Sequence, residues 1–376
     1  TEGVLSRMII DDPELANVGV ILFDEFHERS IHADFGLALA LEVLRSIRPD
    51  LRIIIMSATL DVSPIAKHLG EGTPCLEAQG MLFPVQTKYL PMPRELRFSE
   101  AVAKGIRVAV AEQSGSILAF LPGEGEIKAT AELLAEFCEN HSIELAPLYA
   151  SLPLQEQERA LLPAAHGKRK LVLATSIAES SLTIQGITTV VDSGKARVPR
   201  YSNTTGMTHL ETVRISMDRA DQRRGRAGRL CEGVCYRLWD EREDALMPRC
   251  ATPELCSSEL SALVLMCADF GSTKRTSLPW LTLPPEIAWQ QGVELLQHLE
   301  ALSTDGVITT QGRRLLQLGT HPRLAHAILK TAAIGSSESL VEACLACAAL
   351  SEGIYLRNAS TMSELLLELD GMGAGN

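Results

Sequence analysis

The sequence lacks the features of membrane and secreted proteins. No stretch of about 18 uncharged apolar residues occurs in it, so we expect no membrane-spanning helix. The first residues contain neither a charged leader nor a small-residue cleavage site, which makes a secretory signal there unexpected. Apolar residues begin already at Val4, and we expect the chain to start partway through a domain.

The sequence also has too few cysteines, at irregular positions, for a disulfide framework. Its nine cysteines are an odd number spread along the chain, which favours a reducing, cytoplasmic location. A zinc site needs four ligands, and no further cysteine pair or histidine pair accompanies the two close pairs. We therefore predict buried core cysteines at Cys231, Cys235, Cys344 and Cys347.

Positive charge is scarce overall but concentrated in one stretch. The formal net charge of −12 is unfavourable for a chain that coats nucleic acid indiscriminately. Between Lys195 and Arg229, however, nine basic residues accompany three acidic ones, a local balance of +6. Glycines alternate with arginines in that stretch, which favours phosphate binding over an ordinary solvated face.

The apolar pattern predicts two α/β domains followed by helices. Buried strands at 18–25 and 51–59 alternate with helical stretches, and the alternation resumes near residue 115, as in parallel sheets with crossover helices. We interpret the proline-marked stretch 83–95 as a linker and the runs flanking 203–206 as a β-hairpin. Beyond residue 249, helices and the short run 307–310 indicate a winged-helix fold, followed by an all-helical segment.

Two carboxylates follow the first predicted buried strand. Asp24 and Glu25 come directly after an apolar run, at the edge where open α/β sheets bind ligands. There Asp24 can hold Mg²⁺, and Glu25 can orient an attacking water. Such a pair alone is more often the solvated start of a helix. The histidine at position 27 makes the pattern more specific, which favours the ligand-binding interpretation. Ser57, Ala58 and Thr59 end the next strand, where hydroxyls can relay between two sites or simply cap a helix.

Arginine and hydroxyl residues form two further clusters. Arg226 and Arg229 lie three apart and are predicted to share one helical face, from which guanidinium groups bind phosphate bidentately. An arginine acting on a transferring phosphoryl group contributes on the order of 10³ to 10⁵ in rate. We interpret Gly225 and Gly228 as points where the backbone approaches another surface. The hydroxyl-rich turn 174–184 follows a buried strand and offers donors to phosphate, although it also resembles an ordinary N-cap.

In chain order, these motifs resemble motifs II to VI of the DEAH group of superfamily 2 helicases. The matching strings are DEFHER at 24–29, SAT at 57–59, FLPGEGEI at 120–127, ATSIAESSLTI at 174–184 and QRRGRAGR at 222–229. The DEFHERS form is most similar to the bacterial HrpB-type branch, and the opening TEGVL resembles the motif that contacts the RNA backbone. The resemblance covers essentially the whole chain and implies an ATP-driven RNA helicase.

The resemblance also implies a domain order within an α/β fold. It consists of the C-terminal part of a first RecA-like domain, a complete second RecA-like domain, a winged-helix domain and the start of a helical ratchet-like domain. Their expected bounds are 1–80, 81–243, 244–310 and 311–376.

The resemblance assigns roles to particular residues, with ATP and Mg²⁺ as cofactors and single-stranded RNA as the partner. Asp24 and Glu25 would act on Mg²⁺ and the water, and Gln222 would help to place that water. Arg226 and Arg229 would reach the γ-phosphate across the cleft between the two RecA-like domains. The remaining roles are nucleotide contact by Thr183, interdomain coupling by His27, Ser57, Ala58 and Thr59, and strand binding by Thr1, Gly3, Thr175 and Ser176.

The sequence departs from the family pattern in several places. Phe26 replaces the alanine that names the group, and Ser176, Ser180 and Gln185 replace the usual Asn, Thr and acidic residue. The phosphate-binding pattern GxxxxGK[ST] does not occur in the sequence. We expect that loop to lie upstream of Thr1, and we expect this chain alone to hydrolyse ATP negligibly.

Two alternatives remain open from the sequence. The chain can be a non-motor nucleic-acid-binding module that lacks its catalytic half. It can also belong to a DNA motor, since the motifs contact mainly phosphates and display no 2′-hydroxyl recognition.

Overall fold

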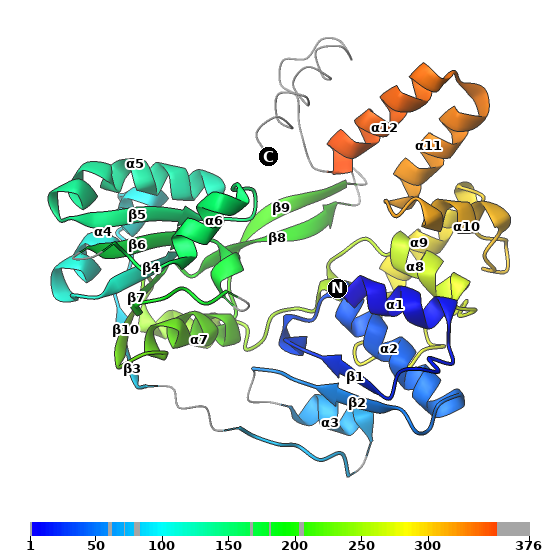
Figure 1. The fold of residues 1–376 in the computed structure, drawn as a ribbon, viewed down its shortest axis with the longest axis horizontal. Coiled ribbons are helices and arrows are strands. Elements are labelled where there is room, and N and C mark those ends of the chain that lie inside the picture. Colours follow the sequence, from blue (N-terminus) through cyan, green and yellow to red (C-terminus); the bar gives the residue numbers. More distant parts are fainter. Residues whose placement is uncertain are drawn as a thin grey trace. The chain divides into compact units, whose positions relative to one another are not determined.

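The computed structural model describes residues 2–58, 62–70, 72–78, 83–165, 168–179, 182–202 and 207–351. Its internal contacts divide the chain into two units. Unit 1 joins Thr1–Thr73 to Pro253–Asn376, and unit 2 is Pro74–Thr252. Figure 1 shows unit 2 as a sheet with helices and unit 1 as a small sheet with many helices.

Unit 2 contains a six-stranded sheet in which every pairing is parallel. Its strand order is β3-β10-β7-β4-β6-β5. Because parallel strands need crossover connections, helices lie between most of them along the chain. The strands are β3 (Val85–Tyr89), β4 (Ser116–Phe120), β5 (Ile143–Leu148), β6 (Arg169–Ala174), β7 (Ile187–Asp192) and β10 (Gly233–Arg237).

Both faces of this sheet are covered, which explains its continuous apolar strands. In β4, Ile117 and Ala119 join one core cluster with residues of the helices α4 (Phe98–Glu112) and α5 (Glu124–Asn140). Leu118 and Phe120 point to the opposite face and join a second cluster with Ala160 and Ala227. The predicted α/β class is confirmed. The remaining helical elements of the unit are α6 (Leu154–Leu161), η2 (Ser176–Ala178), α7 (Met217–Gly225), η3 (Arg226–Gly228) and η4 (Glu241–Leu246).

The predicted hairpin is confirmed, and the predicted linker is wrong. β8 (Lys195–Ser202) and β9 (Met207–Arg214) pair antiparallel, and the turn between them lies outside the described residues. Stretch 83–95 contains β3, which pairs with β10 at the edge of the sheet. Pro84 and Pro91 lie outside the strand, so they do not remove ladder hydrogen bonds.

The first segment of unit 1 contains a two-stranded parallel sheet. Its strands β1 (Val20–Phe23) and β2 (Arg52–Ile55) are connected by α2 (Ile31–Ser46). Phe23 and the middle of α2 belong to one core cluster. Among the described residues, the opposite face is open: Leu22 is 60% and Ile54 is 47% exposed. The prediction of buried strands therefore holds for one face of this sheet and is wrong for the other. The other helices of the first segment are α1 (Glu2–Asp11), η1 (Phe26–Glu28) and α3 (Ser63–Leu69).

The later segment of unit 1 is helical and shares its core with the first. One cluster contains Phe35 and Leu39 together with Leu263, Trp280 and Trp289. An isolated antiparallel bridge joins Leu302 to Ile308, in the stretch where the sequence suggested a wing. The four predicted domains and their bounds stay predictions. The helices here are η5 (Glu254–Cys256), α8 (Ser261–Asp269), α9 (Glu286–His298), α10 (Thr310–Gln317), α11 (Pro322–Ile334) and α12 (Ser337–Ser351).

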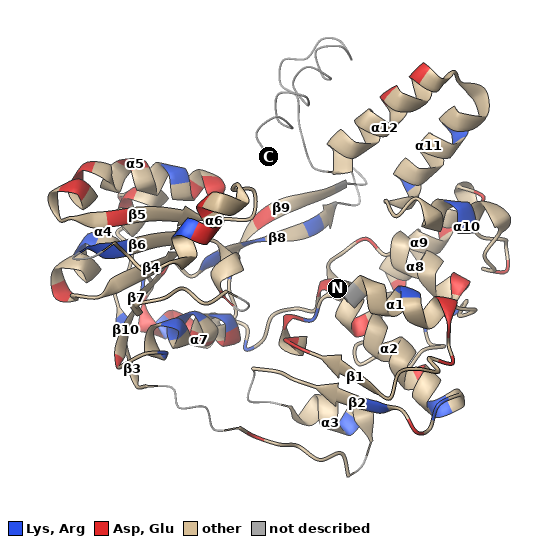
Figure 2. Ribbon diagram, viewed as in Figure 1, with Lys and Arg blue, Asp and Glu red and all other residues tan. Residues whose placement is uncertain are grey.

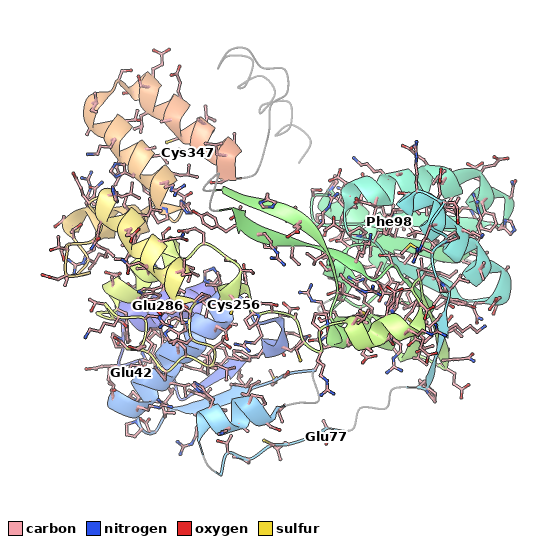
Figure 3. All side chains as sticks on the ribbon, turned by 180° about the vertical axis from the view of Figure 1, so that it is seen from behind. Glu42, Glu77, Phe98, Cys256, Glu286 and Cys347 are labelled. Carbon is pink, nitrogen blue, oxygen red and sulfur yellow. The ribbon has the colours of Figure 1, made fainter. Side chains whose placement is uncertain are left out.

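The prediction for the cysteines is half right. Cys235 and Cys347 are buried, and Cys347 lies on α12 (Figure 3). Cys231 and Cys344 are exposed, so the prediction is wrong for these two. No group of three or more potential metal ligands occurs in the part of the chain that the structure describes. No described helix is long and apolar enough to cross a membrane.

Candidate functional site

The acidic pair lies at the carboxyl end of β1. Asp24 is exposed, and its Oδ1 accepts the backbone N–H of Glu25 at 2.9 Å. Glu25 adopts a left-handed conformation with φ of 48°, which is unfavourable for a residue with a side chain and persists where surrounding contacts enforce it. The Glu25 side chain is 41% exposed. Both carboxylates are therefore accessible to a ligand at this edge.

His27 connects the acidic pair to the end of β2. Its Nδ1 accepts the backbone N–H of Ala58 at 3.2 Å, so this nitrogen carries no proton while the bond persists. The Oε2 of Glu25 lies 3.5 Å from the same Nδ1. Nearby, the Phe26 N–H donates to the Met56 carbonyl at 3.0 Å. The structure thus brings Asp24, Glu25, His27 and Ala58 together, as the sequence predicted for one site.

Of the other predicted site residues of unit 1, two lie among the described residues and two lie outside them. Ser57 is half-buried beside Ala58, and Thr59 lies outside the described residues. Gly3 is half-buried on α1, where an added Cβ would lie 3.7 Å from the His32 ring. Thr1 lies outside the described residues.

In unit 2, arginines of 222–229 contact Glu179, Leu182 and Thr183. Arg226 is 7% exposed and donates from Nε to the Glu179 carbonyl at 2.9 Å and from Nη1 to the Leu182 carbonyl at 2.7 Å. Arg229 is exposed and donates to Thr183 Oγ1 at 3.0 Å. Both predicted phosphate ligands and the predicted nucleotide contact therefore form one cluster.

Arg226 and Arg229 lie at the two ends of a 3₁₀ turn, in which residues three apart still share one face. Helix α7 ends at Gly225, and Arg226 begins the 3₁₀ turn η3. Arg226 is buried and Arg229 is exposed, and their side chains reach the neighbouring residues Leu182 and Thr183. Gln222 lies half-buried on α7, one turn before Arg226.

The interpretation that glycine lets the backbone approach another surface holds for Gly228 and is wrong for Gly225. A Cβ on Gly228 would lie 2.5 Å from the Phe83 carbonyl oxygen, and the Gly228 carbonyl accepts the Phe83 N–H at 2.9 Å. The surface that Gly228 approaches is thus the backbone before β3 in the same unit. A Cβ on Gly225 would meet nothing within 4 Å.

Thr175 and Ser176 follow β6 at the carboxyl edge of the sheet. Thr175 is half-buried, and its N–H donates to the Leu148 carbonyl at 3.1 Å; Ser176 is exposed and begins η2. Because Asp192 ends the parallel strand β7 at the same edge, hydroxyl and charged groups gather there. Figure 2 shows basic residues along α7 and on β8, in the stretch of local positive charge.

Sequence reasoning missed a buried ionic group at this edge. Arg223 is fully buried and donates to Glu179 Oε1 and Asp192 Oδ1, each at 2.7 Å. Its guanidinium also lies 4.8 Å from the centroid of the Phe120 ring. Burial opposes the charge, but the two carboxylates outweigh it and raise the pKa of Arg223 above its ordinary value. The signal in the sequence was the position of Asp192 at the end of an apolar run.

The donor types in the two units suit different partners. The described residues contain no group of three potential metal ligands here, and two adjacent carboxylates fit Mg²⁺, which usually keeps waters and takes one or two carboxylates together with phosphate oxygens. Guanidinium groups beside a hydroxyl fit phosphate oxygens, which accept charge-assisted hydrogen bonds more strongly than the carbonyls that hold Arg226 here.

Comparison with known families gives one matching domain model. Residues 100–231 match the model described as "Helicase conserved C-terminal domain". This range contains the 174–184 and 222–229 motifs and most of the six-stranded sheet.

Curated proteins and solved structures are similar over most of the chain. ATP-dependent RNA helicase HrpB of Escherichia coli is 44% identical over 325 residues, which cover 86% of this chain and 40% of that protein. Probable ATP-dependent RNA helicase DHR2 of Saccharomyces cerevisiae is 34% identical over 349 residues, covering 91% of this chain and 47% of the relative. A crystal structure of Escherichia coli DEAH/RHA helicase HrpB aligns with a TM-score of 0.86 and 39% identity, covering 98% of this chain and 48% of that one. The chain spans less than half the length of these relatives.

Proposed function

Because the chain belongs to the DEAH/RHA helicases of the HrpB type, we propose that it supplies the hydrolytic and strand-contacting parts of an ATP-dependent RNA helicase. In this function, nucleotide hydrolysis drives movement along single-stranded RNA. The supporting observation is the exposed pair Asp24 and Glu25 at a parallel strand end, held by His27 against the end of the next strand.

The chemistry divides between the two units. Asp24 would hold Mg²⁺, and Glu25, whose carboxylate is accessible, would accept a hydrogen bond from the attacking water and orient it. Bound ATP would supply the γ-phosphoryl group that is transferred to water with ADP as the leaving group, and Mg²⁺ would neutralise charge on the phosphate oxygens. Gln222 would help to orient the water.

Arg226 and Arg229 would stabilise the negative charge that develops on the phosphoryl oxygens. To do so, Arg226 exchanges its bonds to the Glu179 and Leu182 carbonyls for phosphate oxygens. Thr183, which already accepts a hydrogen bond from Arg229, would contact the nucleotide beside it.

Strand binding would use the exposed hydroxyl end of β6. Thr175 and Ser176 would contact RNA phosphates together with Gly3 and Thr1 of the first segment, and these contacts carry little sequence information. His27, Ser57, Ala58 and Thr59 would couple hydrolysis to strand movement, since the His27 bond to Ala58 links the acidic pair to this segment.

Substitution of one arginine separates catalysis from binding. In the full-length protein, Arg226→Ala is expected to lower RNA-stimulated ATP turnover on the order of 10³-fold while RNA affinity changes little. Ser176→Ala is the matched variant and is expected to weaken RNA binding with a smaller effect on turnover at saturating RNA. Equal loss of both properties in Arg226→Ala would contradict the division of roles.

Competition between matched RNA and DNA strands tests the substrate. Preferential displacement by RNA is expected if the chain serves an RNA helicase. Equal or stronger displacement by DNA would favour the DNA-motor alternative. RNA binding by a full-length protein that hydrolyses no ATP would favour the non-motor binding module.

A further inference from the structure

The loop that carries the acidic pair is tied to a segment that follows much later in the sequence. Arg29, at the end of this loop, has a left-handed backbone with φ of 51°, and its carbonyl accepts the Glu254 N–H at 3.1 Å. Glu254 and Arg29 both belong to unit 1, within one compact body. The loop 24–29 is therefore anchored by η5 as well as by its own strands.

The Arg29 side chain reaches the same later segment. Its Nη2 donates to Thr282 Oγ1 at 2.7 Å, across 253 positions of sequence. Its Nε donates to the buried carboxylate of Asp34 at 2.9 Å, and its guanidinium lies 5.7 Å from the centroid of the Phe26 ring. The side chain is 19% exposed, so water screens these bonds only partly. Arg29 thus has a single enforced orientation.

Glu254 also caps the helix that follows the loop. Its Oε2 accepts the N–H of Ile31, the first residue of α2, at 3.1 Å. A carboxylate at a helix N-terminus satisfies a free backbone donor and is favoured by the helix dipole. Ser30 caps the same end by accepting the Ala33 N–H at 3.0 Å. In Figure 3, Cys256, which ends η5, lies beside the blue helices of the first segment.

Two further contacts extend this junction beyond Arg29. Phe35 stacks on Trp280, with ring centroids 5.9 Å apart, and His68 Nε2 lies 2.9 Å from the Pro279 carbonyl oxygen. Segment 253–286 is therefore packed along the loop, α2 and α3, and is fixed by polar contacts at several points. A displacement of this segment must be transmitted to Arg29.

The geometry of the loop makes Arg29 important for Glu25. The short turn η1 is bounded by two left-handed residues, Glu25 before it and Arg29 after it, and the Arg29 N–H donates to the Phe26 carbonyl at 3.1 Å. Left-handed residues with side chains persist only where their surroundings enforce the conformation. Contacts at the Glu25 end come from Met56 and Ala58, just after β2, whereas contacts at the Arg29 end come from Glu254 and Thr282.

We propose that Arg29 is a positioning residue whose contacts with Glu254 and Thr282 let segment 253–286 set the orientation of Glu25, and thus the rate of hydrolysis. This inference rests on the proposed function of Glu25. The segment acts through the loop and contacts neither nucleotide nor RNA in this role. Anything that binds and moves segment 253–286 would then change the rate of the chemical step while leaving nucleotide binding largely unaltered.

The test removes one hydrogen-bond acceptor with little change in side-chain shape. In the full-length protein, Thr282→Val deletes the hydroxyl that Arg29 contacts, and Thr282→Ser, which keeps it, is the matched control. We expect Thr282→Val to lower kcat for RNA-stimulated hydrolysis roughly tenfold, the effect of a poorly oriented catalytic group, with KM for ATP and the midpoint of thermal unfolding nearly unchanged. Thr282→Ser is expected to retain at least half of the wild-type kcat.

A second background distinguishes positioning from a general structural effect. When Glu25→Gln is already present, Thr282→Val is expected to cause no further loss in single-turnover rate, because it acts only through Glu25. An unchanged kcat in Thr282→Val, a change confined to KM, or a further tenfold loss in the Glu25→Gln background would overturn the proposal. Absence of any turnover in the wild-type full-length protein would instead refute the proposed function and, with it, this inference.

Discussion

His27 Nδ1 accepts the backbone N–H of Ala58 at 3.2 Å, and this bond joins the acidic loop to the end of the neighbouring strand. The two residues are 31 positions apart, but β1 and β2 are adjacent and parallel, so their carboxyl ends meet at one edge. A movement of residues 56–58 therefore also displaces the loop that carries the acidic pair.

Replacement of His27 tests this link. We expect His27→Ala to lower RNA-stimulated ATP turnover on the order of tenfold, because Ala58 loses its acceptor and the acidic loop loses its bond to the end of the neighbouring strand. His27→Asn, which retains an acceptor near that position, is the control and should keep more of the stimulation. Turnover of the full-length protein with and without RNA is the measurement. Equal loss of RNA-independent turnover in both variants would contradict a coupling role.

Arg223 is predicted to be essential for the stability of unit 2. Arg223→Leu leaves the buried carboxylate of Asp192 without its cation and Glu179 with only Arg219, whose Nε is 3.8 Å away, which is expected to cost about 3–5 kcal/mol. Arg224→Leu is the matched control, since Arg224 is 41% exposed and its ion pair with Asp221 contributes about 0–1 kcal/mol. Urea unfolding of the chain, followed by hydrogen exchange in β4 and β7, measures the difference. Similar losses for both variants would refute this assignment.

Substitution of two glycines that lie three positions apart should have opposite effects on stability. Gly228→Ala forces a Cβ against the Phe83 carbonyl and is expected to lower the free energy of unfolding by about 1–3 kcal/mol. Gly225→Ala has open space at the end of α7 and should be neutral or stabilising by up to about 1 kcal/mol. Thermal unfolding of both variants is the measurement. A stable Gly228→Ala variant would show that the contact with Phe83 relaxes easily.

The Glu259 carboxylate predicts a pH dependence of stability. Burial alone would raise the pKa of Glu259, but hydrogen bonds from His321 and Ser261 outweigh it and hold the pKa below its ordinary 4.5. A lowered folded-state pKa means that the carboxylate stabilises the fold at pH values above 4.5 and that this stabilisation is lost as pH falls through the lower folded value.

Glu259→Gln removes this titration. The variant is expected to lose about 1–3 kcal/mol of unfolding free energy at neutral pH and to show a flatter stability profile below 4.5. Unfolding free energies of wild type and variant across that range provide the measurement. Parallel profiles for the two proteins would contradict the role of Glu259.

The sequence was sufficient for much of the fold because apolar runs and turn residues are local signals. The strands β4, β6 and β7, the hairpin and α5 all follow from such runs. We predicted a linker at β3 because its proline neighbours suggested irregular structure. The hydrogen bonds that make it a strand join it to β10, which lies 145 or more positions later in the chain. The exposed face of β1 and β2 was also missed, since periodicity does not reveal what covers a sheet.

The candidate site was only partly predictable for the same reason. Motif spacing identified Asp24, Glu25, His27, Arg226 and Arg229, and the structure brings these residues into two clusters. Arg223 was not assigned a role, because its buried carboxylate partners become neighbours only after folding. Likewise, Arg29 shows its importance only when Thr282 and Glu254 lie beside it.

In the proposed function, Glu25 and Arg226 serve one phosphoryl transfer. The most direct test is the single-turnover rate of RNA-stimulated ATP hydrolysis by the full-length protein carrying Glu25→Gln, Arg226→Ala or both. Each substitution alone is expected to reduce the rate on the order of 10³-fold, and the double variant should be little slower than either, as for groups that act as a unit. A double variant whose rate falls by the product of the two single effects would show that the two groups act independently. A single variant that retains wild-type turnover would show that its residue has no role in the transfer.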